Sequence, residues 1–148
     1  MLKIGDTVPP FTAPLDDGNT FNLDDYKGKN IIIYFYPRNN TPGCTKEACN
    51  IRDNYESLIE AGLTILGVST DPVTSHQKFK NKYSLPFPLI SDKEKQVVAL
   101  FGVKSKIGTA KRVTFWIGAD GTVKHVWDKV NTVAHSQEIL DVFADSSA

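Results

Sequence analysis

At 148 residues, the chain has the length of a single domain over residues 1–148, which can bury roughly 70% of its unfolded surface. Its 17 acidic and 17 basic residues cancel to zero net charge, so no charge excess attracts nucleic acid. A hydrophobic fraction of 41% excludes the disordered and fibrous classes. No run reaches the roughly 20 apolar residues of a membrane helix, and the amino-terminal residues lack the apolar core of a signal peptide. We therefore expect a cytoplasmic protein without a membrane partner.

Two apolar segments predict buried strands joined by a helix. Residues 31–36 (IIIYFY) form a continuous β-branched and aromatic run, which suits a central strand covered on both faces. Residues 63–69 (LTILGVS) have the same character. The segment between them is long enough for a helical crossover, and together they predict a βαβ unit.

The crossover begins with a helix start signal. Thr41 can cap the helix, and Pro42 suits its first position, which places Cys44 in the first turn. Apolar residues then follow at helical spacing, and they predict one helix that contains Cys44, Ala48, Ile51, Tyr55, Leu58 and Ile59.

The remainder of the chain predicts further helices and a hairpin. We expect helices over 72–83, 93–101 and 135–143, and strands over 113–117 and 122–127 around a turn at 118–121. This order of elements indicates an α/β, thioredoxin-like fold with a central mixed β-sheet flanked by helices. A fold of this kind does not by itself give a function.

Residues 36–45 (YPRNNTPGCT) contain the candidate reactive residue, Cys44, and the residues that surround it in sequence. Free amides and the positive dipole end of a helix favour the thiolate form of Cys44, which makes that side chain nucleophilic. The Thr41 hydroxyl could donate or accept a hydrogen bond at a substrate oxygen that Cys44 attacks. Pro37 and Pro42 stiffen the loop. Without this context, Cys44 would be interpreted as an inert core residue beside a helix cap.

Metal and cofactor sites find no support in the sequence. The two cysteines are too few for a disulfide scaffold and lack the partners of a zinc site. His76, His125 and His135 are scattered, and no pair has metal-ligand spacing on one helix face. We expect no cofactor, and we assign these histidines no function.

The segment resembles the peroxiredoxin family. The family signature PxxxTxxC stands here as Pro37, Thr41 and Cys44, and the longer string YPRNNTPGCTKEACNIRD is similar to the peroxiredoxin Q or bacterioferritin comigratory protein subgroup. The resemblance extends over most of the chain and includes the opening GDTVPPFTAPLDDG, which is similar to the amino-terminal β-hairpin extension of that family.

The resemblance implies a thiol-dependent peroxidase that acts on hydrogen peroxide and organic hydroperoxides. It implies that Cys44 is the peroxidatic cysteine, that Cys49 resolves it as an intramolecular disulfide, and that Arg112 approaches the thiolate. Thioredoxin or a similar dithiol is the implied reductant, and a monomer is the implied state. Asn39 stands where an aspartate is commoner in the subgroup, which leaves the substrate preference open.

Two other functions stay open on the residues alone. A thioredoxin-like disulfide oxidoreductase also uses a cysteine at a helix start, although it prefers the spacing Cys-x-x-Cys. A non-catalytic redox sensor would use the two cysteines only to report oxidation. Taken singly, Cys49 fits a core position and Arg112 fits a solvated surface.

Overall fold

The computed structural model describes residues 1–147, and Ala148 lies outside them, so the single-domain expectation over 1–148 stays a prediction. The described part is an α/β fold. Its strands are β1 Thr12–Pro14, β2 Thr20–Asn22, β3 Asn30–Phe35, β4 Leu63–Ser69, β5 Leu89–Ser91, β6 Val113–Ile117 and β7 Val123–Trp127. Its α-helices are α1 Pro42–Asp53, α2 Tyr55–Glu60, α3 Val73–Tyr83, α4 Gln96–Phe101 and α5 His135–Ser147, and a 3₁₀ turn spans Leu23–Tyr26.

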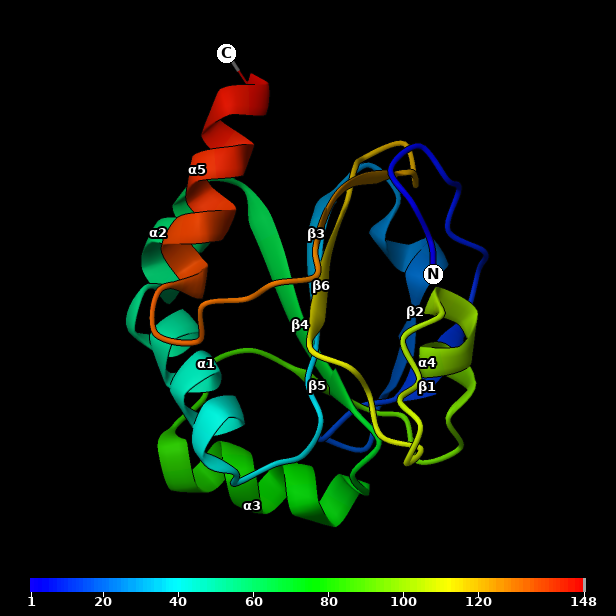
Figure 1. The fold of residues 1–148 in the computed structure, drawn as a ribbon, viewed down its shortest axis with the longest axis vertical. Helices are drawn as coiled ribbons and strands as arrows, with labels where there is room; N and C mark the ends of the chain where they lie inside the picture. Colours follow the sequence, from blue (N-terminus) through cyan, green and yellow to red (C-terminus); the bar gives the residue numbers. More distant parts are fainter. Residues whose placement is uncertain (148) are drawn as a thin grey trace.

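The main sheet has five strands in the order β5-β4-β3-β6-β7. β3 is central and pairs parallel with β4 and antiparallel with β6, so the sheet is mixed, as predicted. β1 and β2 form a separate antiparallel pair, which confirms the amino-terminal hairpin. In Figure 1, α1, α2, α3 and α5 lie on one side of the sheet, and α4 lies with β1 and β2 on the other.

β3 is buried on both faces because helices or the β1–β2 pair cover each side. Its side chains alternate: Ile31, Ile33 and Phe35 point towards α4, whereas Ile32 and Tyr34 point towards α1 and α5. This alternation explains the unbroken apolar run.

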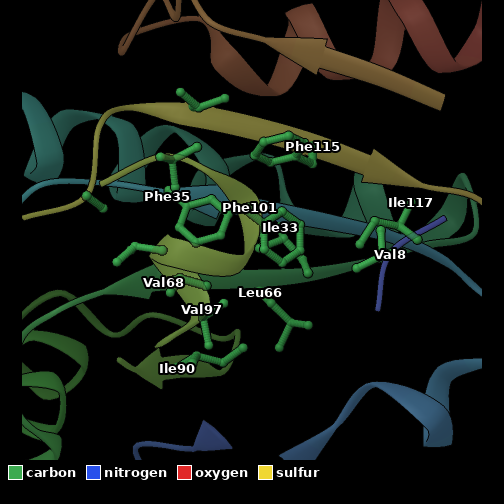
Figure 2. Packing of buried hydrophobic residues seen from close by; sticks show 14 of the residues in the cluster. Val8, Ile33, Phe35, Leu66, Val68, Ile90, Val97, Phe101, Phe115 and Ile117 are labelled. Atoms are coloured by element: carbon green, nitrogen blue, oxygen red, sulfur yellow. The ribbon is translucent and has the colours of Figure 1, made fainter. Parts of the chain in front are cut away.

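Figure 2 shows the α4 side of this arrangement, where Phe101 lies among the side chains of the sheet. The Phe101 ring centroid is 5.1 Å from that of Phe35 and 5.0 Å from that of Phe115. Burial of these rings contributes to the packing that holds α4 on the sheet.

The expected single crossover helix is wrong, because the helix breaks at Asn54. This residue has φ −117° and ψ 17°, and α2 starts anew after it. Its side-chain amide donates to the Asn50 carbonyl at 2.9 Å, a local bond of the kind that competes with helix continuation. Beyond the break, Ile59 is 45% exposed instead of buried.

One further helix begins later than expected, and one short strand was not expected. The helix expected from residue 93 begins at Gln96, because Lys95 has a left-handed φ of 61° and the chain turns there. The Asp92 carboxylate then accepts from the amides of Val97 and Val98 at 3.1 and 2.8 Å. Strand β5 was not predicted, since its three residues are too few to show a period.

The amino-terminal segment reaches both edges of the sheet. At β7, the Gly5 amide donates to the Val123 carbonyl at 2.8 Å, and the Val123 amide donates to Asp6 at 2.9 Å. At β5, the Asp16 amide donates to the Leu89 carbonyl at 3.0 Å, and the Asp16 carboxylate accepts from the Leu89 amide at 2.9 Å. We call residues 5–16 the amino-terminal strap.

Candidate functional site

Cys44 is the third residue of α1, in the turn that follows the loop after β3. Thr41 is the N-cap and Pro42 the first helical residue, as predicted. The thiol is only 1% exposed, so the first turn of α1 and its oriented amides surround a largely desolvated sulfur.

Arg112 contacts the sulfur directly. The residue precedes β6, whose first residue Val113 pairs with Phe35 at the end of β3, so Arg112 and the start of α1 meet at the same end of the sheet. Its Nη2 donates to Cys44 Sγ at 3.4 Å. The guanidinium thus brings a permanent positive charge and a directed donor to the thiol.

Glu47 holds the other side of the guanidinium, and the sequence analysis missed it. Arg112 Nη1 donates to Glu47 Oε1 at 2.6 Å, and the glutamate side chain is fully buried. Burial raises the pKa of Glu47 to about 7, although the Arg112 charge opposes that rise. Its position one turn after Cys44, on the same helix face, was a signal that the sequence did contain.

His135, to which we assigned no function, lies behind Glu47. The His135 Nε2 atom is 4.0 Å from Glu47 Oε2 and 2.8 Å from the Thr114 hydroxyl oxygen. Its Nδ1 atom is 2.9 Å from Glu138 Oε1. Burial lowers the pKa of His135 below 6.5, although Glu138 opposes that shift. A chain of buried polar groups therefore runs from Cys44 into α5.

A second network fixes the loop before Cys44 through Asn39. Its side chain accepts from the Tyr36 hydroxyl at 2.6 Å and donates to His76 Nδ1 at 2.9 Å. Its backbone amide donates to the Asp71 carboxylate at 2.9 Å. The residue that departs from the subgroup pattern is thus buried and anchors the loop to the start of α3.

Thr41 and Pro37 lie in this loop at half-buried positions. The Thr41 hydroxyl donates to the Arg38 carbonyl at 2.9 Å and makes no capping bond, so the expected side-chain cap is wrong. The N-cap position itself is confirmed. The hydroxyl instead closes the turn that precedes the helix.

Cys49 lies on the same helix as Cys44 and is half-buried. Five residues along an α-helix separate two Cα atoms by roughly 8.7 Å, whereas a disulfide spans at most about 6.8 Å. The structure therefore brings Arg112 to Cys44 but leaves the two cysteines too far apart to bond while α1 is intact.

Residues 1–147 meet the requirements of neither a metal site nor a membrane-spanning helix. Within that range, no group of three or more His, Cys, Asp or Glu side chains could hold a metal ion. None of the helices described there is long and apolar enough to span a membrane.

Known proteins resemble this chain over nearly its whole length. Residues 4–126 match the AhpC/TSA family. A putative peroxiredoxin Bcp of Coxiella burnetii is 45% identical over 146 residues, which cover 94% of this chain and 97% of that protein. The peroxidoxin BcpB structure of Mycobacterium tuberculosis has a TM-score of 0.92 at 35% identity and covers 98% of both chains. A Xanthomonas campestris bacterioferritin comigratory protein, described for its alkyl peroxide reduction activity, has a TM-score of 0.89 at 29% identity and covers 100% of this chain and 99% of its own.

Proposed function

The chain belongs to the AhpC/TSA family as a peroxiredoxin of the Bcp and Q type, and from this we propose how its residues divide the work of a thiol-dependent peroxidase. Cys44 is the peroxidatic residue, Arg112 its electrostatic partner and Cys49 the resolving residue. Hydrogen peroxide and alkyl hydroperoxides are the substrates.

The contact between Arg112 and Cys44 carries this proposal. The 3.4 Å approach of Nη2 to Sγ puts a cation against the nucleophile, where it stabilises the thiolate. The thiolate attacks one peroxide oxygen and the O–O bond breaks, which leaves a sulfenic acid on Cys44 and an alkoxide or hydroxide that takes a proton. Directed donors at the site stabilise the departing oxygen.

Cys49 completes the cycle in a second step. Its thiol sulfur bonds to the sulfur of the Cys44 sulfenic acid and one water leaves, which forms an intramolecular disulfide. Because the intact helix holds the two cysteines too far apart, α1 must unwind locally for this step. Thr41 and Pro37 lie in the loop before Cys44, and we propose that they shape it around the peroxide because of this position.

A dithiol reductant of the thioredoxin type restores the two thiols. One of its thiolates attacks the disulfide and forms a mixed disulfide with the peroxidase. Its second thiol then attacks the mixed disulfide and releases the peroxidase thiol, so two electrons pass to the peroxidase. The monomeric state and the cytoplasmic location expected from the sequence stay predictions.

The test compares Cys44→Ser with Cys49→Ser. Cys44→Ser should abolish peroxide consumption, because a hydroxyl is a far weaker nucleophile than a thiolate at neutral pH. Cys49→Ser should react once and gain one oxygen atom by intact mass, then stall with thioredoxin as reductant. Substantial turnover by Cys44→Ser would falsify the assignment of the nucleophile, and undiminished turnover by Cys49→Ser would remove Cys49 from the resolving step.

A further inference from the structure

The first residue of α5 presents a lone pair to the polar chain behind Cys44. His135 is fully buried, and its Nδ1 atom lies 2.9 Å from Glu138 Oε1. Because a carboxylate only accepts hydrogen bonds, Nδ1 carries the hydrogen and the neutral ring has its lone pair at Nε2. That lone pair accepts the Thr114 hydroxyl at 2.8 Å, and Glu47 Oε2 lies 4.0 Å from the same nitrogen.

Glu47 Oε2 is a buried oxygen that needs a partner. Among residues 1–147 it is one of two buried side-chain polar atoms without a hydrogen bond, the other being the Tyr34 hydroxyl. Leaving such an atom without a partner is costly, and more so if it is charged. One proton placed between Glu47 Oε2 and His135 Nε2 would satisfy Glu47 Oε2 after a small approach of the two side chains, once the Thr114 hydroxyl turns away from the Nε2 lone pair.

We propose that His135 is a positioning residue for the peroxide reaction, which shares one proton with Glu47 and so keeps the Arg112 guanidinium aimed at Cys44. With the proton present, the Glu47 carboxyl is held at both oxygens, by Arg112 on one side and by His135 on the other. Without it, the carboxylate is anchored only at Oε1, by Arg112, so the carboxylate and the guanidinium can turn together away from the sulfur. The proposal rests on the proposed function of Cys44 and Arg112.

The groups around Glu47 set the pH at which this proton is lost, and that pH is near neutral. Arg112 faces it from before β6, Tyr34 from β3, and His135 and Glu138 from α5. Burial raises the pKa of Glu47 to about 7 and lowers the pKa of His135, so a proton between them stays mainly on the Glu47 carboxyl. Burial raises the pKa of Tyr34 well above 10, which leaves that side chain neutral. The pair holds its proton below about pH 7 and loses it above.

The experiment measures the rate constant of Cys44 oxidation by hydrogen peroxide at pH values from about 6 to about 8. His135→Asn keeps a donor for Glu138 at the Nδ1 position and removes Nε2. We expect it to slow oxidation roughly tenfold at the acidic end, with a loss that shrinks towards the alkaline end as the wild type also loses the proton. His125→Asn is the matched control, because the His125 ring packs on Trp127 at 4.5 Å and lies outside this chain of groups.

A double-mutant cycle tests whether His135 acts through Glu47. In a Glu47→Gln background, His135→Asn should cause no further loss, since the shared proton is already gone. A loss that is additive, or one that is the same at every pH, overturns the proposal. Should His135→Asn fail to fold, Glu138→Gln, which weakens the partner of Nδ1 and keeps a side-chain oxygen for the Asn131 amide, must give a smaller loss with the same pH dependence, and an unchanged profile counts against the proposal. If the wild type itself does not consume peroxide, the proposed function fails as well, so the two failures are distinguishable.

Discussion

At the scale of single residues, the geometry around Arg112 explains why glycine stands before the cysteine. A Cβ atom at position 43 would lie 3.0 Å from Arg112 Nη2, tighter than ordinary packing allows. The guanidinium would have to shift by a few tenths of an ångström, away from the position in which it contacts Cys44 Sγ. Glycine at this position is therefore a matter of space beside the reacting sulfur.

Gly43→Ala should change activity and stability in opposite directions. The added methyl group displaces Arg112 and slows oxidation of Cys44, whereas alanine favours the helix over glycine by up to about 1 kcal/mol. Stopped-flow peroxide oxidation and denaturant unfolding measure the two effects on one variant. Lys46→Ala, exposed on the same helix, is the control and should leave the oxidation rate unchanged. A Gly43→Ala variant as fast as the wild type would show that the position of Arg112 is not critical.

Glu47→Gln should become more stable relative to the wild type as the pH rises. Between pH 4.5 and about 7 the carboxyl ionises in the unfolded chain while the buried one stays protonated, so the wild type loses folding free energy across that window. At about 1.4 kcal/mol per pH unit, the widening amounts to roughly 3 kcal/mol. Urea unfolding of both proteins at the two ends measures it, and the exposed Glu56→Gln is the control. A gap that does not widen would mean that Glu47 is ionised throughout.

The site could be predicted from the sequence only where a motif carried it. Cys44 and Arg112 were named because the residues around them resemble a family, and the structure brings them together. Glu47 was missed although it follows Cys44 by one helical turn, and His135 could not be named, because what distinguishes it is burial beside Glu47 from a distant element. A single glutamate on a helix is normally interpreted as solvent-exposed.

At the scale of secondary structure, α1 is tied to α5 through one asparagine. The Asn50 side chain donates to the Val133 carbonyl at 3.0 Å and accepts from the Ser136 amide at 2.8 Å. Asn50 directly follows Cys49, so unwinding of α1 that extends to this residue would break both bonds. The break at Asn54 then separates this unwinding from α2.

Amide hydrogen exchange should show this division. In the disulfide form, residues 45–53 and the first turn of α5 should exchange faster than in the reduced form, whereas Tyr55–Glu60 should keep its protection. Mass spectrometry of the two redox forms measures the difference, and the Cys49→Ser variant treated with peroxide is the control without a disulfide. If residues 45–53 stay equally protected, the resolving thiol must come from another protein.

Periodicity predicted the longer elements and failed on the short ones. The strand over residues 63–69 and the helix ending at Tyr83 were found because their apolar patterns are long enough to show a period. β5 is three residues long, and the break at Asn54 depends on one side-chain bond. Neither leaves a pattern in the sequence.

At the scale of the whole molecule, the sheet separates two cores with different content. The α4 face buries a hydrophobic cluster and, at the start of α4, the Asp92 carboxylate, whereas the opposite face buries Cys44 together with Glu47 and His135. The reacting groups thus share a core with α5, while α4 and the β1–β2 pair support β3 from behind. Phe101→Ala, on the α4 face, should cost about 3–5 kcal/mol of unfolding free energy yet leave the oxidation rate of the folded protein unchanged.

The amino-terminal strap has a consequence for how copies of this chain behave towards one another. A sheet edge with unpaired amides and carbonyls is a template for a strand of another molecule, and the strap occupies part of both edges. Asp16→Ala would loosen it on β5, because it removes the carboxylate bonds to the Leu89 amide and to Lys80, whose Nζ lies 3.0 Å from the carboxylate. We expect that variant to self-associate and precipitate at concentrations at which Asp17→Ala, altered in the adjacent exposed turn, stays dispersed. Light scattering against concentration tests this, and equal behaviour of the two variants would mean that the strap does not protect the β5 edge from aggregation.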